Sequence, residues 1–218
     1  MPSMNPDGFE YVDSKFPKRD NCTEHEGRYN RNSKRNFRDP SLSGKDLNRN
    51  FPYLHFSKTF DFENGINLGH FNYQEPESKA VTKWINNVSD NPFVLSISFH
   101  GGTEIVLYPY GGAHQYPDYK LTFSTLDEKL FEYLSLTYGK SHKRWKNWQA
   151  SQGKICDNQK YNFTHFPIAN TGKNLYAVYG GMGDYNYDYS NCLEIMVELS
   201  CCKFPPESQL IKEWNDNK

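Results

Sequence analysis

The chain has 218 residues and a nearly balanced charge, with 25 Lys and Arg against 26 Asp and Glu. This length suits one domain, or most of a large one, with a core of its own. The balanced charge gives no sign of a nucleic-acid or membrane-surface partner, and no apolar run approaches the roughly 18 residues of a membrane span.

The first 52 residues carry clusters of Pro, Asn, Asp and Gly that are typical of loops between short elements. A turn is predicted at 4–8, followed by a strand from Phe9 to Val12. Residues 75–88 predict a helix, because Pro76 suits a first helical turn and Glu77 suits the positive end of the helix dipole. Its apolar stripe consists of Ala80, Val81, Trp84, Ile85 and Val88.

The apolar, β-branched and aromatic run from Phe93 to Phe99 predicts a buried strand. Period two places its aromatic and large aliphatic side chains on one face and Ser96, Ser98 and His100 on the other. Two glycines follow His100 and can take backbone angles that other residues resist. Ligands of α/β sheets bind at the carboxyl ends of strands, so His100 is a candidate site residue. A hydrogen-bonded histidine at a strand end is the alternative.

Residues 125–138 predict a second amphipathic helix, with leucines and a tyrosine at a spacing of four. The polar and aromatic stretch 139–175 is long for a loop, and such loops are usually functional or partly ordered by disulfides. Residues 191–200 predict a strand with Glu194, Met196 and Glu198 on one face, and 205–218 open like a helix. Helices that alternate with strands predict an α/β sheet.

The cysteines and glycosylation sequons bear on the compartment. The sequons lie at Asn21, Asn87 and Asn162. The spacing of the cysteines is not that of a zinc ribbon or a zinc finger. The cysteines are Cys22, Cys156, Cys192, Cys201 and Cys202. Together they favour the extracellular space or the secretory pathway, with a reduced cytosolic protein as the alternative.

Five stretches in order resemble the zinc metallocarboxypeptidases, above all the regulatory subfamily that includes carboxypeptidases N, E, M and D. These stretches are PSMNPDGFE (2–10), DLNRNFP (46–52), SFHGG with YPY (98–110), GGMGDYNY (180–187) and NCLEIMVELSCCKFP (191–205). The resemblance implies a mixed, mostly parallel twisted sheet with helices on both faces. It also implies one zinc ion and removal of the C-terminal residue from peptides or proteins, by a monomer.

Peptide-bond hydrolysis by zinc needs three protein ligands and an open position for water. The resemblance implies that His100 is a zinc ligand and that Glu198 is the general base. A glutamate on an exposed sheet face is the alternative for Glu198. Arg28 matches the arginine that polarises the scissile carbonyl, and Arg31 and Arg35 are its competitors.

The remaining matched residues would bind the substrate. Asn48 and Arg49 match the family's pair for the free C-terminal carboxylate, which the planar fork of arginine binds in a bidentate way. Tyr176 matches the tyrosine that closes over the substrate and donates a hydrogen bond. A packed aromatic side chain is the alternative for Tyr176.

The chain also departs from the family's pattern. It lacks the His-x-x-Glu motif that supplies the first two zinc ligands upstream of 2–10, and it stops within the last catalytic helix. We therefore expect residues 1–218 to be a partial catalytic domain that is inactive on its own. Gly111 stands where the family usually has an acidic residue, and Gly183 stands where it usually has a glutamine. Both of those residues favour substrates with a basic C-terminal side chain. Little preference for C-terminal Lys or Arg is therefore expected, unless Glu104 or Asp184 compensates.

Two alternatives to a secreted carboxypeptidase remain open. A carboxypeptidase-like domain that binds without cutting is favoured by the two glycines and the missing ligands. A cytosolic carboxypeptidase is the other, and the sequons and the SCCKFP run argue against it.

Overall fold

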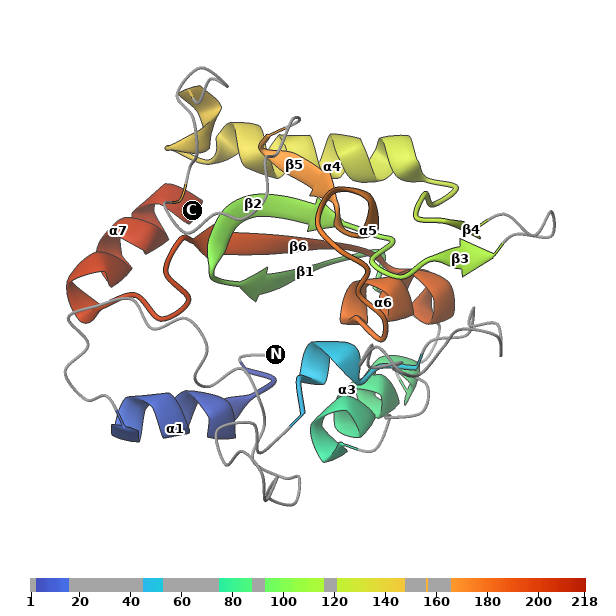
Figure 1. The fold of residues 1–218 in the computed structure, drawn as a ribbon, viewed down its shortest axis with the longest axis horizontal. Coiled ribbons are helices and arrows are strands. Elements are labelled where there is room, and N and C mark those ends of the chain that lie inside the picture. Colours follow the sequence, from blue (N-terminus) through green and yellow to red (C-terminus); the bar gives the residue numbers. More distant parts are fainter. Residues whose placement is uncertain are drawn as a thin grey trace.

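The structure is a computed structural model that describes residues 3–15, 45–52, 75–87, 93–115, 121–147, 156 and 166–218. A four-stranded sheet lies at its centre, in the order β1 (Leu95–His100), β6 (Leu193–Ser200), β2 (Thr103–Tyr108) and β5 (Ile168–Asn170) (Figure 1). β1 runs parallel to β6, and β2 is antiparallel to β6 and parallel to β5. The predicted mixed, mostly parallel sheet is therefore confirmed. Two short strands, β3 (His114–Gln115) and β4 (Leu121–Thr122), form a separate antiparallel pair.

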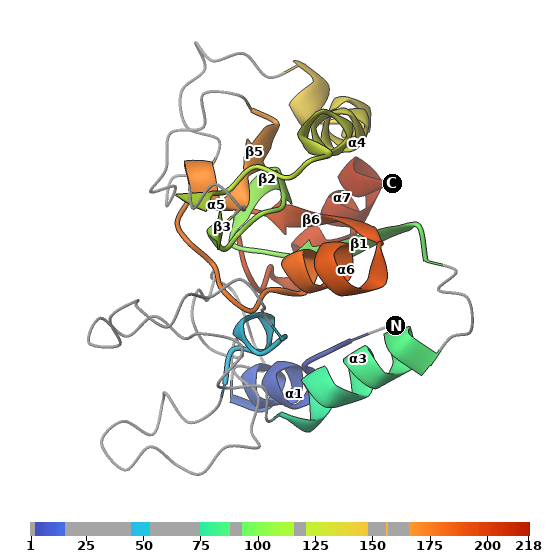
Figure 2. The same cartoon turned by 90° about the vertical axis from the view of Figure 1, so that its right-hand side faces the viewer.

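Helices cover both faces of the sheet, as Figures 1 and 2 show. On one face, α4 (Glu128–Ser141) packs Phe131 into a core with Val106 and Val197. On the other, α6 (Met182–Ser190) lies against β6, with α3 (Pro76–Asn87) beyond it. The remaining elements are α1 (Pro6–Lys15), η2 (Leu47–Arg49), η4 (Trp145–Asn147), α5 (Thr171–Asn174) and α7 (Glu207–Asn217). No helix in the described ranges is both long and apolar enough to cross a membrane.

The predicted strand at 9–12 is wrong, because this segment lies within the helix α1. The side chain of Asn5 accepts a hydrogen bond from the Gly8 N–H at 3.2 Å, as a helix N-cap does. Pro6 and Asp7 follow in the first turn, where a missing N–H costs nothing and a negative charge is favoured. The Asn-Pro-Asp-Gly stretch therefore begins a helix and does not close a turn before a strand.

The predicted helices at 75–88, 125–138 and 205–218 are confirmed as α3, α4 and α7, but their buried faces differ from expectation. In α3, Val81 and Ile85 of the predicted stripe are buried, but Trp84 is 51% exposed and Ala80 is exposed as well. In α4 the buried residues are Phe131, Ser135 and Gly139, while Leu126 is exposed. A strict spacing of four drifts around a helix of 3.6 residues per turn, so the leucine row does not follow one face. No residue of α7 is buried.

The strand ending at His100 is confirmed, but it is not buried as predicted. Leu95 is 48% and Phe99 is 60% exposed. β1 is an edge strand of the described sheet, and the apolar core beneath α4 is built on β2, β5 and β6. The buried strand is instead β2, in which Ile105 and Val106 are fully enclosed.

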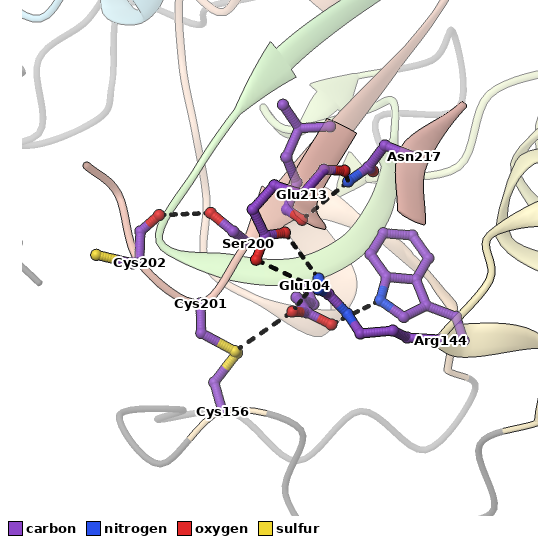
Figure 3. The surroundings of a disulfide bond; sticks show 10 residues. Glu104, Arg144, Cys156, Ser200, Cys201, Cys202, Glu213 and Asn217 are labelled. Carbon is purple, nitrogen blue, oxygen red and sulfur yellow. Dashed lines mark hydrogen bonds and ion pairs between the residues drawn. A yellow bond between two sulfur atoms is a disulfide. The ribbon is translucent and has the colours of Figure 1, made fainter. Parts of the chain in front are cut away.

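Polar contacts hold α7 against the sheet, close to a disulfide between Cys156 and Cys201 (Figure 3). Arg144 lies 2.6 Å from Glu104 of β2, 2.9 Å from Glu213 and 2.7 Å from Asp216 of α7. The indole N–H of Trp145 also donates to Glu104 at 2.7 Å. Burial raises the pKa of Glu104, and Trp145 and Arg144 oppose the rise. Glu104 is therefore occupied by these partners.

Candidate active site

One cavity of about 650 Å³ collects predicted site residues from distant parts of the sequence. It lies along the face of β1 that carries Ser96, Ser98 and His100, and along the face of β6 that carries Glu194 and Glu198. Five of the six predicted site residues line it: Asn48, Arg49, His100, Tyr176 and Glu198.

His100 and Glu198 are partners in the parallel register of β1 and β6, at the carboxyl ends of the two strands. After His100 the chain crosses the end of β6, because β2 pairs with the opposite edge of that strand. Gly102 makes this crossing with a φ of +121°, which a side chain would disfavour, and its N–H donates to the Ser200 carbonyl at 2.9 Å. The two glycines thus explain why the strand ends directly after the histidine.

Glu198 is partly buried and faces the cavity. This placement disfavours the alternative of a glutamate on an exposed sheet face. A carboxylate next to the strand-end histidine, in a cavity closed by protein on several sides, has the chemistry of a general base.

The pair Asn48 and Arg49 is held by hydrogen bonds at the N-terminus of α6. The Asp46 side chain accepts from the Asn48 N–H at 3.0 Å and so caps η2. The Asn48 side-chain oxygen accepts from the Met182 N–H at 2.9 Å, which directs its amide N–H groups away from that helix. Arg49 donates from Nη1 to the Asn48 carbonyl at 2.8 Å and lies 3.9 Å from Asp46. Both side chains line the cavity, so they can bind an anion there.

Tyr176 lies beside Arg49. Its hydroxyl is 3.5 Å from Arg49 Nη2, and the guanidinium carbon is 6.0 Å from the ring centroid. The side chain is 44% exposed, so it is not the packed aromatic of the alternative. A phenol in this position can donate to a group bound by Arg49.

Several predicted features lie outside the described residues: Arg28, Arg31, Arg35, Cys22, Asn21 and Asn162. Within the described ranges no group of three or more His, Cys, Asp or Glu side chains is arranged to hold a metal ion. His100 is the one residue in those ranges that matches a zinc ligand of the family.

Asp184 is one of the two acidic residues that could compensate for the acidic residue missing at Gly111. In the structure its carboxylate already has other hydrogen-bond partners. Its carboxylate accepts hydrogen bonds from the N–H groups of Gly111 at 2.9 Å and Gly112 at 2.8 Å, and it is buried. A Cβ on Gly111 would lie 2.9 Å from the Val178 carbonyl oxygen, so the backbone packing there favours glycine. Asp184 therefore positions the backbone that follows β2.

The inner end of the cavity contains a residue to which sequence reasoning gave no role. Glu194 is 1% exposed and lines the cavity beside Ser96 and Asn186. Burial raises its pKa, and hydrogen bonds from Ser96, Ser98 and Asn186 oppose the rise. The available signal was its spacing: Glu194 precedes Glu198 by four residues in one strand, which puts both side chains on one face.

The sequence and the fold both match known carboxypeptidases. A family model described as zinc carboxypeptidase matches residues 1–218. The chain is 37% identical to carboxypeptidase M of Mus musculus over 219 residues, which cover 100% of this chain and 41% of that protein. It is 36% identical to the carboxypeptidase N catalytic chain of Homo sapiens over 230 residues, which cover 100% of this chain and 44% of that protein. The chain thus spans less than half the length of these relatives.

Solved structures agree at the level of the fold. Bovine thrombin-activatable fibrinolysis inhibitor, in complex with tick carboxypeptidase inhibitor, matches with a TM-score of 0.65 at 19% identity, over 99% of this chain and 64% of that one. Carboxypeptidase A from Helicoverpa armigera matches with a TM-score of 0.62 at 18% identity, over 100% of this chain and 47% of that one. The whole-length match and the curated relatives show that the chain belongs to the zinc carboxypeptidase family, and these relatives are of the regulatory subfamily that its motifs predicted.

Proposed function

We propose that this chain supplies the substrate clamp, the general base and one metal ligand of a zinc-dependent exopeptidase, which removes the C-terminal residue from peptides or proteins. The observation that carries the proposal is the meeting of Asn48 and Arg49 with His100 and Glu198 in one cavity. An anion clamp beside a histidine and a carboxylate is what hydrolysis of a terminal peptide bond requires.

The clamp selects a chain end. The guanidinium of Arg49 binds the terminal carboxylate, and the Asn48 amide donates to the same group. The N-terminus of α6, which Asn48 caps, adds a positive dipole at this place. Tyr176 closes over the bound residue and donates its hydroxyl hydrogen to the substrate. The last peptide bond then lies at the end of the cavity that contains His100 and Glu198.

Glu198 takes a proton from the attacking water as the water oxygen bonds to the scissile carbonyl carbon. It passes that proton to the amide nitrogen as the C–N bond breaks, so the products are a shortened peptide and a free amino acid. A zinc ion, when bound at His100, lowers the pKa of water and polarises the carbonyl. His100 is one of the three protein ligands that a catalytic zinc ion needs, and Arg28 is proposed to stabilise the oxyanion.

The disulfide between Cys156 and Cys201 supports an oxidising compartment, and we propose the secretory pathway or the extracellular space. The second candidate function is a domain that binds C-termini without cutting them. The same clamp of Asn48 and Arg49 favours it, because the clamp serves binding whether or not a cut follows.

The test uses the product of the longest natural reading frame that contains these 218 residues, supplied with zinc. We expect release of C-terminal amino acids from peptides, inhibition by a chelator, and no release from the same peptides with an amidated C-terminus. Glu198→Gln should lower kcat by about 10²- to 10⁴-fold without lowering the zinc content. Activity that survives this substitution would refute the role of Glu198, and peptide binding without cleavage would favour the second candidate.

A further inference from the structure

The C-terminal end of α3 carries an asparagine that the candidate active site does not use. Asn87 is the last residue of this helix, and Val88 and Ser89 follow it in the sequence, so the three form an Asn-X-Ser sequon. α3 lies on the outer side of the described fold, beyond α6 (Figure 2), and Asn87 is exposed. The acceptor amide of this sequon therefore lies on an accessible surface.

The residues of α3 divide between a buried side and an exposed side. Val81 and Ile85 are buried in a cluster with Tyr185 of α6. Asn86 also contacts α6, because its side-chain oxygen accepts a hydrogen bond from the Tyr185 hydroxyl at 3.3 Å. Asn87 differs from its neighbour, since no described residue forms a hydrogen bond with its side chain. Its amide nitrogen is thus available for modification.

The exposed side of α3 also contains a large aromatic side chain that the described part of the chain leaves open to water. Trp84 is 51% exposed, although it belongs to the apolar stripe that was expected to be buried. Its indole contacts the ring of Phe93 at a centroid distance of 5.0 Å and an interplanar angle of 47°. This contact covers only part of the indole. Apolar area in contact with water is unfavourable, so a group that covered the rest would be stabilised.

Asn87 is placed to cover Trp84. Residues three apart in a helix are neighbours on its surface, with Cβ atoms about 5–6 Å apart. Side chains of a helix also lean towards its N-terminus, so each of them lies over the preceding turn. A group attached to the Asn87 amide therefore extends over the turn that contains Trp84.

We propose that Asn87 is a glycosylation site and that the first N-acetylglucosamine of an N-linked oligosaccharide packs on the exposed face of Trp84. This inference rests on the proposed secretory compartment. The co-reactant is an oligosaccharide carried on a lipid pyrophosphate. Asn87 Nδ2 bonds to the anomeric carbon of this oligosaccharide, the bond from that carbon to the pyrophosphate oxygen breaks, and the amide loses one proton. Ser89 supplies the hydroxyl that the sequon requires two residues after the asparagine.

A pyranose ring suits the surface of an indole. One face of N-acetylglucosamine presents C–H groups, while its hydroxyl groups lie around the rim of the ring. Hydrogen atoms on carbon carry a partial positive charge, and they are attracted to the negative face of an aromatic ring. The sugar can thus cover the apolar indole while its own hydroxyl groups stay in water.

This glycan would lie far from the candidate catalytic residues. Phe93, which contacts Trp84, precedes His100 by seven residues along the chain. An extended chain rises about 3.3 Å per residue, so the sugar and His100 would be about 20 Å apart. We therefore expect the same rate of hydrolysis with and without the glycan.

The first test maps the occupied sequons. The product of the longest natural reading frame is made in animal cells, once with its own N-terminus and once with an added secretion signal. Enzymatic removal of the glycans in heavy-oxygen water leaves a mass label at each occupied asparagine. We expect the label at position 87 in both forms, its loss in Ser89→Ala, and its retention in Ser89→Thr.

The two forms separate this inference from the proposed compartment. A label at position 87 only with the added signal would support the site and refute the secretory compartment. Labels at Asn21 or Asn162 without one at Asn87, or no label in either form, would overturn the site.

The second test measures the contact with Trp84. The protein is made in cells that keep glycans in the high-mannose form, and its Tm is compared with that of Ser89→Ala, which keeps Asn87 but loses its glycan. We expect the glycan to raise Tm by about 2–4 °C. This gain should persist after an endoglycosidase trims the glycan to one sugar, because only the first sugar contacts the indole.

Trp84→Ala decides whether the indole is the partner. The gain in Tm from the glycan should disappear in this background, as it does when one member of an interacting pair is removed. If Trp84→Ala does not fold, Trp84→Leu replaces it, since leucine keeps an apolar side chain without an aromatic face. A gain of the same size in either background, or no gain in the unaltered chain, would overturn the contact.

Discussion

Replacement of Arg144 by methionine should loosen α7 and destabilise the protein. α7 buries none of its residues, and its contacts with the rest of the fold include the ion pairs of Arg144 with Glu213 and Asp216. The same guanidinium pairs with Glu104, whose side chain is 9% exposed. Removal of one partner of a buried pair costs about 3–5 kcal/mol, because the other charge is left without compensation. Arg144 itself is 25% exposed, so we expect a loss somewhat below that range, about 2–3 kcal/mol.

The pH dependence of this loss follows from Glu104. Burial raises the pKa of Glu104, so the folded state binds a proton more readily than the unfolded state, and stability falls as pH rises through that pKa. Without Arg144 the pKa of Glu104 rises further, so the destabilisation should be largest near pH 7 and should shrink towards pH 4.5.

Urea denaturation at several pH values measures the loss, and hydrogen exchange in 207–217 reports on α7 directly. The control is Arg144→Met combined with Glu104→Gln, which should recover about 1 kcal/mol or more of the loss at pH 7. A loss below about 0.5 kcal/mol, or one that does not vary with pH, would refute this reasoning.

Two further predictions concern other parts of the fold. Burial and the charge of Arg144 lower the pKa of His142 to about 4, so the folded state resists its protonation, and stability should fall as pH drops from 6.5 towards 4. His142→Asn should reduce the loss between pH 7 and pH 5 by about 1–2 kcal/mol in urea denaturation, and an unchanged profile would contradict this. Arg49→Lys should lower kcat/KM by about tenfold or more, because an ammonium cannot bind a carboxylate in a bidentate way; unaltered kinetics would exclude Arg49 from the clamp.

The fold could be predicted from the sequence where local signals and tertiary packing agree. The helix α3 follows from Pro76, Glu77 and its apolar stripe, and Val81 and Ile85 are buried as expected. The strand predicted at 9–12 is wrong because Asn5 caps a helix that begins at Pro6 and continues through this segment. The position of α7 could not be predicted from its apolar residues, because it packs through ion pairs with Arg144, the residue directly before η4.

The exposure of the apolar face of β1 also depends on tertiary packing and could not be predicted from its own sequence. Period two correctly assigns alternate residues to opposite faces, and His100 points into the cavity with Ser96 and Ser98. The period does not say what covers each face. In the described part of the chain α4 packs over the strands next to β1, so Leu95 and Phe99 remain exposed although their sequence is typical of a core.

The site residues were predicted from motifs that lie far apart in the sequence, and the fold brings five of the six to one cavity. The Asn-Arg pair, the histidine before two glycines, the tyrosine and the glutamate were each open to another interpretation, and their shared cavity now favours the functional one. Glu194 shows the limit of this approach. A glutamate in a strand is usually solvated on an outer face. Glu194 is instead 1% exposed, because α6 packs Asn186 against it and places Gly183, three residues earlier in the same helix, close to its other oxygen. The chemistry of this position depends on the packing of a helix against a strand, and that is a tertiary fact that neither segment contains alone.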